Sequence, residues 1–167
     1  MVETLDNLWE AFAGEAQANR KYTIFAEIAE AEGHHGIAGL FKAAAQSEDV
    51  HLRCHLRSLE GIGSTVENLK EAIEGERYEY TEMYPEFASK AKEEGMKEAR
   101  LCFNYAKMVE ERHESLYSEA LEAVSSGKDL SQHTYFVCQV CGNLEIDGLP
   151  KSCPVCGNPE EVFREVR

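Results

Sequence analysis

The sequence predicts an all-α four-helix bundle followed by a small four-cysteine metal-binding β module. From about residue 4 to residue 125, apolar residues recur at steps of three and four, which is the period of a helix with one face toward a core. From Tyr135 onward, two C-x-x-C pairs and short runs of β-forming residues replace that period. We therefore assign residues 1–126 to the bundle, residues 127–134 to a linker and residues 135–167 to the module.

Four long helices are expected, because glycine-containing breaks interrupt the helical period at three places. The breaks fall at residues 33–36, at residues 61–64 and at Gly95. After the second break, Ser64 and Glu67 have the spacing of a capping box, in which each side chain accepts a hydrogen bond from the backbone N–H of the other residue. Pro85 lies inside the third helical stretch, and we expect it to kink this helix rather than end it, because the apolar period continues beyond it.

An internal repeat runs through the helical part at an offset of 62 residues. Aromatic, glycine, glutamate and histidine positions match without a gap, which is difficult to attribute to chance similarity between amphipathic helices. The matched pairs include Tyr22 with Tyr84, Phe25 with Phe87, Gly33 with Gly95, Glu48 with Glu110 and His51 with His113. Two helix pairs of similar design therefore follow each other.

Each half of the repeat contains one Glu-x-x-His motif, Glu48 with His51 and Glu110 with His113. Residues three apart share a helix face, so both side chains of a motif can reach one point in space. A single motif in a chain this rich in glutamate is typical of a solvated helix face. Two motifs at equivalent repeat positions instead favour an inward-facing site.

The other two helices supply further carboxylates. Glu15 lies among small and apolar residues, and Glu76 and Glu79 are three apart in the third helix. One carboxylate from each of two helices, with a Glu-x-x-His motif from each of the others, is the arrangement of carboxylate-bridged dimetal bundles. Ionised carboxylates in a bundle core each cost on the order of several kcal/mol in desolvation, so cations or protons must accompany them. The mixed Glu and His set favours iron or manganese over calcium or structural zinc.

The C-terminal cysteines form two knuckles, Cys138 to Cys141 and Cys153 to Cys156, and each knuckle can place two thiolates on one tetrahedral ion. Glycine follows the second cysteine of each pair, which permits the positive φ that turns backbone N–H groups toward the sulfurs. Zinc and iron share this ligation, so the spacing alone leaves the metal open.

Composition excludes several classes of partner. The chain has 31 acidic and 17 basic residues and a net charge of −14, which disfavours binding to nucleic acid or to anionic membrane surfaces. No apolar run has the roughly 20 residues that a membrane-spanning helix needs, and the N-terminus lacks the features of a signal peptide. We therefore expect a cytoplasmic protein, and in a reducing cytoplasm the spacing of the cysteines indicates a metal site more than disulfides.

Several motifs follow one another in a specific order along the whole chain. They are Gly14-Glu15-Ala16-Gln17-Ala18, Gly75-Glu76-Arg77-Tyr78-Glu79, Thr81-Glu82-Met83-Tyr84-Pro85, the two Glu-x-x-His helices and the cysteine-rich tail. This set resembles the rubrerythrin family. The resemblance implies a ferritin-like bundle and a rubredoxin-like iron tetrathiolate domain, and the Tyr135-Phe136-Val137 segment before the first knuckle agrees with the latter.

The resemblance also implies three iron ions per chain, two in a carboxylate site and one on the four cysteines, with zinc as a substitute. Glu48 and Glu110 would bridge the two irons, and one iron would move between Glu79 and His51 as its oxidation state changes. The implied metal ligands are Glu15, Glu48, His51, Glu76, Glu79, Glu110, His113, Cys138, Cys141, Cys153 and Cys156. Tyr22 and Tyr84 would line the site as catalytic residues together with Glu79 and His51, or would pack as ordinary core aromatics.

The activity that the resemblance implies is that of a non-haem di-iron peroxidase, which reduces hydrogen peroxide to water and protects against oxidative stress. The chain lacks a nicotinamide-binding fingerprint, so electrons would come from an external rubredoxin or NAD(P)H-dependent reductase. A homodimer or higher homo-oligomer is expected. The alternatives are a ferritin-like ferroxidase that handles iron, with a structural or electron-transfer cysteine site, and an interaction protein with a structural zinc knuckle.

Overall fold

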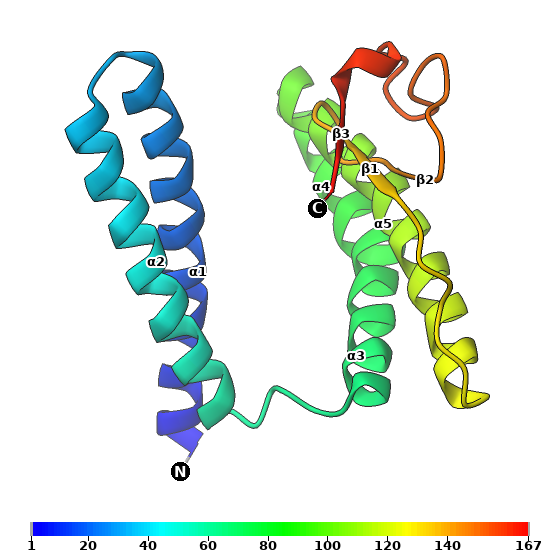
Figure 1. Ribbon diagram of the computed structural model, residues 1–167, viewed down its shortest axis with the longest axis horizontal. Helices are drawn as coiled ribbons and strands as arrows, with labels where there is room; N and C mark the ends of the chain where they lie inside the picture. Colours follow the sequence, from blue (N-terminus) through cyan, green and yellow to red (C-terminus); the bar gives the residue numbers. More distant parts are fainter. Residues whose placement is uncertain (1, 167) are drawn as a thin grey trace. The chain divides into compact units, whose positions relative to one another are not determined.

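Helices account for nearly all of the chain up to Ser125, as the apolar period predicts (Figure 1). The computed structural model describes residues 2–166 and divides into two units, the first ending at Gly63 and the second beginning at Ser64. Among the described helices, none is both long and apolar enough to cross a membrane.

The first unit is an antiparallel hairpin of two long helices, α1 (Val2–Ala31) and α2 (His35–Ser58). Gly33 forms the turn between them with a φ of +81°, a conformation that side-chain-bearing residues rarely adopt. The Asn19 side-chain amide donates a hydrogen bond of 2.7 Å to the Ala45 carbonyl and so fixes the register of the two helices. Small residues allow the helices to approach closely, and the buried ones are Ala26, Ala29, Ala38 and Ala45.

The helical part of the second unit is also a hairpin. Its first arm is one continuous stretch made of α3 (Thr65–Tyr78), the π-helical segment η1 (Glu79–Met83) and α4 (Tyr84–Glu93), and its second arm is α5 (Lys97–Ser125). Gly95 forms the turn with a φ of +72°. The prediction of four long helices is confirmed, and the helix continues through Pro85.

Aromatic side chains pack in the same way in both hairpins. The ring centroids of Phe25 and Phe41 lie 5.6 Å apart, and those of the equivalent Phe87 and Phe103 also lie 5.6 Å apart. Tyr22 lies 6.1 Å from Phe41, and Tyr84 lies 6.2 Å from Phe103. The repeat seen in the sequence is therefore also a repeat of packing.

The C-terminal module is a small antiparallel sheet with strand order β2-β1-β3. Its elements are β1 (Tyr135–Cys138), β2 (Leu144–Ile146), the short 3-10 helix η2 (Glu160–Val162) and β3 (Phe163–Glu165). Cys138, Cys153 and Phe163 form its buried core. The first knuckle lies against α5, because a Cβ at Gly142 would be 3.8 Å from Val109 Cγ1. The predicted fold class, a helical bundle followed by a small four-cysteine β module, is confirmed.

The predicted capping box at the start of α3 is present. The Ser64 N–H donates to Glu67 Oε2 at 2.7 Å, and the Glu67 N–H donates to Ser64 Oγ at 3.4 Å. Replacing Ser64 by Ala leaves a helix N–H without its acceptor, so we expect a loss of about 1 kcal/mol in the free energy of unfolding. Denaturant titration of the variant measures this loss. Ser89→Ala, at an exposed position inside α4, is the matched control and should change stability by less than about 0.5 kcal/mol.

Candidate metal centres

The first hairpin brings three of the predicted ligands together. Glu15 from α1 meets Glu48 and His51 from α2, and their ligand atoms all lie within 4.8 Å of one another. His51 Nδ1 is 3.0 Å from Glu48 Oε2 and 3.7 Å from Glu15 Oε1. We call this group the first cluster.

Charge is shared unevenly within the first cluster. A hydrogen bond between the two carboxyl groups raises the pKa of Glu15 and lowers the pKa of Glu48, and Glu48 also accepts a hydrogen bond from His51. Two carboxyl groups this close favour a proton or a cation between them, because each negative charge disfavours ionisation of the other group. A cation that replaces the proton would meet two oxygen ligands and one nitrogen ligand.

The second hairpin forms an equivalent group from Glu76 of α3 and from Glu110 and His113 of α5, again with ligand atoms within 4.8 Å. His113 Nδ1 is 2.7 Å from Glu110 Oε2 and 3.5 Å from Glu76 Oε1. We call this group the second cluster. Its geometry repeats that of the first cluster, as the offset of the two Glu-x-x-His motifs predicts.

The second cluster has the larger electrostatic perturbation. Burial, together with the nearby Glu110 carboxylate, raises the pKa of Glu76 to about 7. Burial and Glu110 also raise the pKa of Glu79, whereas the hydrogen bond to Glu110 raises the pKa of His113 by stabilising its charged form. A site that holds protons near neutral pH in this way is one that a divalent cation can occupy by displacing them.

The π-helical segment explains how a further carboxylate reaches the second cluster. Glu15 and Tyr22 are seven residues apart, whereas the corresponding Glu76 and Tyr84 are eight apart. The extra residue is absorbed by η1, where the Tyr84 N–H donates to the Glu79 carbonyl in a π-type bond. Glu79 opens this segment and interacts electrostatically with Glu110, whereas the first hairpin has Ala18 at the corresponding place.

The two predicted tyrosines lie in different surroundings. Tyr22 is half-buried and packs against Phe25 and Phe41, which agrees with the core-packing interpretation. Burial raises the pKa of Tyr84, and the neighbouring Glu79 carboxylate adds to this effect, so the Tyr84 hydroxyl lies within electrostatic reach of the second cluster.

Two further residues near the clusters were not singled out by the sequence. Burial and the Glu76 carboxylate raise the pKa of Tyr117, which follows His113 by one helical turn. Its repeat equivalent is His55, whose charge acts on Glu15 in the first cluster. The spacing of four residues from each ligand histidine is the signal that would have revealed both.

The four cysteines of the module are brought together as a tetrahedral ligand set. Cys138 Sγ lies 3.7 Å from Cys156 Sγ, and Cys141 Sγ lies 3.5 Å from Cys153 Sγ. A tetrahedron with metal–sulfur bonds of about 2.3 Å has edges of about 3.8 Å, so these separations fit one metal ion and are far too long for disulfides. The predicted positive φ is present at both glycines, +83° at Gly142 and +74° at Gly157.

One sulfur of this set accepts an additional hydrogen bond. Both knuckles read C-x-V-C-G-N, but the Asn158 side-chain amide donates to Cys156 Sγ at 3.3 Å, whereas the Asn143 amide donates to Glu145 Oε1 at 2.8 Å. Burial disfavours the thiolate at Cys156, yet the side chain and backbone of Asn158 outweigh burial and lower the pKa of Cys156 to about 6. The two knuckles are therefore electrostatically unequal despite their matching sequence.

Carboxylate and histidine ligands gathered from paired helices are typical of ferritin-like dimetal proteins. Tetrathiolate knuckles on a three-stranded sheet are typical of rubredoxin-like domains. The chain combines both, which defines it as a ferritin-like metalloprotein with a C-terminal rubredoxin-like domain.

Comparisons with known proteins give the family. The rubrerythrin family model matches residues 6–121, and the model of the rubrerythrin rubredoxin-like domain matches residues 136–164. A rubrerythrin of Porphyromonas gingivalis is 37% identical over 99% of this chain and 90% of its own length, and rubrerythrin-2 of Clostridium acetobutylicum is 34% identical over 96% of this chain and 95% of its own. The structure of fully reduced, all-ferrous nigerythrin aligns over 98% of this chain and 86% of its own with a TM-score of 0.58 and 32% identity. The chain belongs to the rubrerythrin family.

The raised pKa of Glu76 predicts how the metal-free protein responds to pH. Between the ordinary value of 4.5 and about 7, folded Glu76 keeps a proton that the unfolded chain has released. The folded state then binds more protons than the unfolded state, so its stability falls as pH rises through this window. Glu76→Gln removes the titrating carboxyl group. We expect this variant to lose less stability than the wild type between about pH 5 and about pH 8.

Thermal unfolding of chelator-treated protein across this pH range measures the effect. Glu74→Gln, an exposed position on the same helix, is the matched control and should keep the wild-type pH dependence. Equal slopes for the wild type and Glu76→Gln would contradict the assignment.

The Asn158 hydrogen bond predicts a shift in the reduction potential of the iron-loaded module. Reduction adds negative charge to the sulfurs, and an N–H donor to Cys156 stabilises that charge. Asn158→Ala should therefore shift the equilibrium about tenfold toward the oxidised form, which is about 59 mV for one electron. Asn143→Ala is the control, because its amide bonds to Glu145. A redox titration followed by visible absorption measures the reduction potential of each variant. Equal shifts in the two variants would contradict this role of Asn158.

Proposed function

We propose that this protein is a non-haem di-iron peroxidase that reduces hydrogen peroxide to water and protects against oxidative stress. The observation that carries the proposal is the presence, in one chain, of a four-cysteine site, which would be a one-electron centre with iron bound, and of two carboxylate–histidine clusters suited to a pair of ions. Storage of iron would not need the electron-transfer module, and a structural zinc knuckle would leave the clustered carboxylates without a purpose.

The proposed metal ligands are those that the family resemblance implies. The carboxylate site would use Glu15, Glu48, His51, Glu76, Glu79, Glu110 and His113, and the tetrathiolate site would use Cys138, Cys141, Cys153 and Cys156. Three iron ions per chain would fill these sites, with zinc as a competitor at the cysteines. When bound, the iron pair would supply two electrons at one place, which the reduction of one peroxide to two waters consumes together with two protons.

Residues of the second hairpin are suited to hold those protons. Glu76, with a pKa of about 7, exchanges a proton near neutral pH when no metal is bound, and Glu79 is shifted in the same direction by burial. The raised pKa of Tyr84 keeps its hydroxyl protonated beside these carboxylates. We propose Tyr84 and Glu79 as the groups that deliver protons to the leaving oxygen, with Tyr22, the repeat equivalent of Tyr84, and His51 as further catalytic residues from the first hairpin.

The contact between the module and α5 suits an electron path. Gly142 follows Cys141 directly, and the same glycine lies against Val109, the residue before Glu110. This places the backbone beside one cysteine close to the residue that precedes one cluster carboxylate. An external rubredoxin or NAD(P)H-dependent reductase would supply the electrons, and a reducing cytoplasm would keep the four cysteines available as ligands.

A single reoxidation experiment tests the proposal. Iron-loaded protein is reduced anaerobically and mixed in separate runs with stoichiometric hydrogen peroxide or dioxygen, and the visible absorption of the ferric tetrathiolate is followed. We expect the colour to return much faster with peroxide. The Glu110→Ala variant, which loses a cluster ligand but keeps the module, should recolour slowly with peroxide, because its tetrathiolate no longer has a competent carboxylate site beside it.

Two results would contradict the peroxidase. Equally fast recolouring with dioxygen would favour a ferroxidase, and a module that takes up only zinc would favour a structural role. Rapid recolouring of Glu110→Ala would show that oxidation of the tetrathiolate does not depend on the carboxylate clusters.

A further inference from the structure

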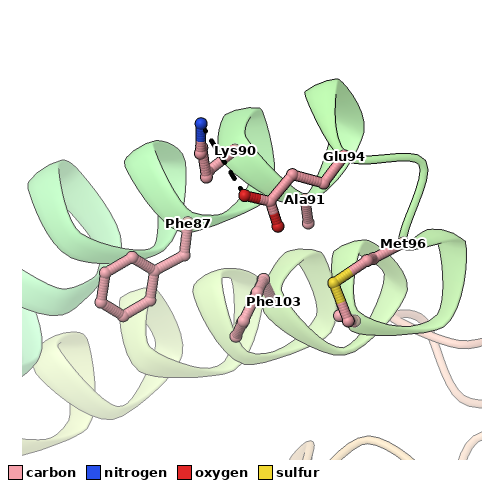
Figure 2. A pocket seen from close by; sticks show the side chains of 7 residues that line it. Phe87, Lys90, Ala91, Glu94, Met96 and Phe103 are labelled. Atoms are coloured by element: carbon pink, nitrogen blue, oxygen red, sulfur yellow. Dashed lines mark ion pairs between the residues drawn. The ribbon is translucent and has the colours of Figure 1, made fainter.

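Two apolar hollows lie along the second hairpin, one toward each end of α5. The first is near the Gly95 turn, has a volume of about 350 Å³ and is lined by residues of both hairpin arms, among them Phe87 and Phe103 (Figure 2). The second has a volume of about 280 Å³ and is lined by His113 and by residues that follow it on α5. The second hollow also has walls from the linker and from the C-terminal module, so it joins three parts of the chain.

Apolar side chains from the hairpin, the linker and the module face one another across the second hollow. Leu69 comes from α3, Leu116 and Ala120 come from α5, Leu130 comes from the linker, and Tyr135 is the first residue of β1. Leu130 is 42% exposed, so the rest of its side chain is covered. Because apolar surface is withdrawn from water there, the linker is held against the hairpin at Leu130.

The end of α5 directs the chain toward this hollow. The Lys128 N–H donates to the Ala123 carbonyl at 3.0 Å, and the Gly127 N–H donates to the Val124 carbonyl at 3.0 Å. With a φ of +74° at Gly127, these bonds form a Schellman motif, which ends the helix and reverses the chain. The linker then runs back along α5 toward the module (Figure 1).

The far end of the linker is fixed to the module through Asp147. His133 Nδ1 lies 2.6 Å from Asp147 Oδ2, and the Thr134 N–H donates to Asp147 Oδ1 at 2.9 Å. The Asp147 N–H in turn donates to the Thr134 carbonyl at 2.8 Å. Two adjacent linker residues are therefore held in one place on the module, directly before β1.

Without the Leu130 contact, the linker would leave the module a wide choice of positions. The chain from Gly127 to Tyr135 spans at most about 28 Å when extended. Val109, which lies against Gly142, is about 24 Å back along α5 from the end of the helix at Ser125. The linker can therefore reach this position, but its length does not select it. A contact that fixes the middle of the linker removes much of that freedom.

We infer that residues 128–134 act as a strap and that Leu130 is the positioning residue that seats the four-cysteine module on α5, which sets the rate of electron transfer between the module and the carboxylate site. The electron-transfer part rests on the proposed function. Each transfer moves one electron from the reduced tetrathiolate to the carboxylate site that hydrogen peroxide has oxidised, and it moves no atom. Its rate therefore depends on how closely the two sites are held. A loose tether, with a module seated by its own contacts alone, is the competing arrangement.

Replacing Leu130 by Gln tests the strap. The Gln side chain is close to Leu in size, but its amide would lose hydrogen bonds to water inside an apolar hollow, so the strap should leave its place. Leu149→Gln is the matched control, because Leu149 is 41% exposed and is not among the residues that line the hollow. Leu130→Met keeps an apolar side chain of similar volume and should restore the behaviour of the wild type.

The first measurement reports seating of the module without iron. In the zinc-loaded protein, a nuclear Overhauser contact between the Val109 methyl groups and the Gly142 α-protons shows that the module lies on α5. We expect this contact in the wild type, in Leu149→Gln and in Leu130→Met. In Leu130→Gln we expect the ratio of seated to unseated module to fall at least about tenfold, which weakens the contact. A contact of unchanged intensity in Leu130→Gln would overturn the strap.

The second measurement reports electron transfer. Iron-loaded, reduced protein is mixed with stoichiometric hydrogen peroxide, and oxidation of the carboxylate site and of the tetrathiolate is followed separately by near-ultraviolet and visible absorption. In Leu130→Gln we expect the carboxylate site to be oxidised at the wild-type rate and the tetrathiolate to recolour about tenfold more slowly, in proportion to the loss of seating. A general loss of structure would instead slow both steps.

The two measurements separate the strap from the proposed function. Equal recolouring rates in Leu130→Gln and Leu149→Gln would overturn the positioning role, even where the contact with Val109 is lost. A wild type whose tetrathiolate is not oxidised by peroxide would contradict the proposed function. The zinc-loaded protein would still decide whether Leu130 seats the module, because that measurement depends on neither iron nor peroxide.

Discussion

Carboxylates held against one another between helices are the constraint on which the helical region depends. Each cluster sets two carboxyl groups beside one histidine. Two ionised carboxylates at this separation repel strongly where water is scarce, so one must take up a proton or both must share a cation. The pKa values of Glu15 and Glu76 are both raised, that of Glu76 to about 7, which is the direction that this repulsion and burial predict. Cations in the same places would stabilise the same hairpins, which couples metal binding to folding.

Much of the fold follows from relations between residues a few positions apart, and these were predictable. The apolar period fixes the helices, Gly33 and Gly95 supply the positive φ of the turns, and the Ser64 hydroxyl and Glu67 carboxylate begin α3. The cysteine knuckles follow from the same kind of local rule. The cluster residues could be predicted because the repeat keeps the two Glu-x-x-His motifs in register. Agreement between the two halves of the chain distinguished these residues from ordinary surface charges.

The features that the sequence did not predict depend on the backbone path and on which of several nearby groups forms a given hydrogen bond. The one-residue difference between the two Glu-to-Tyr spacings was visible, but only the backbone shows that the extra residue forms a π-helical turn at Glu79. Identical C-x-V-C-G-N knuckles gave no reason to expect that Glu145 would capture one asparagine amide while Cys156 captured the other.

The two hairpins differ in residues that lie beside the metal clusters. Duplication alone would give two equivalent clusters, yet the second hairpin has Glu79 where the first has Ala18, and Tyr117 where the first has His55. The same hairpin holds the carboxyl group with a pKa of about 7 and lies against the first cysteine knuckle through Val109. Burial raises the pKa values of Glu76, Glu79 and Tyr84, and all three residues lie in the second hairpin.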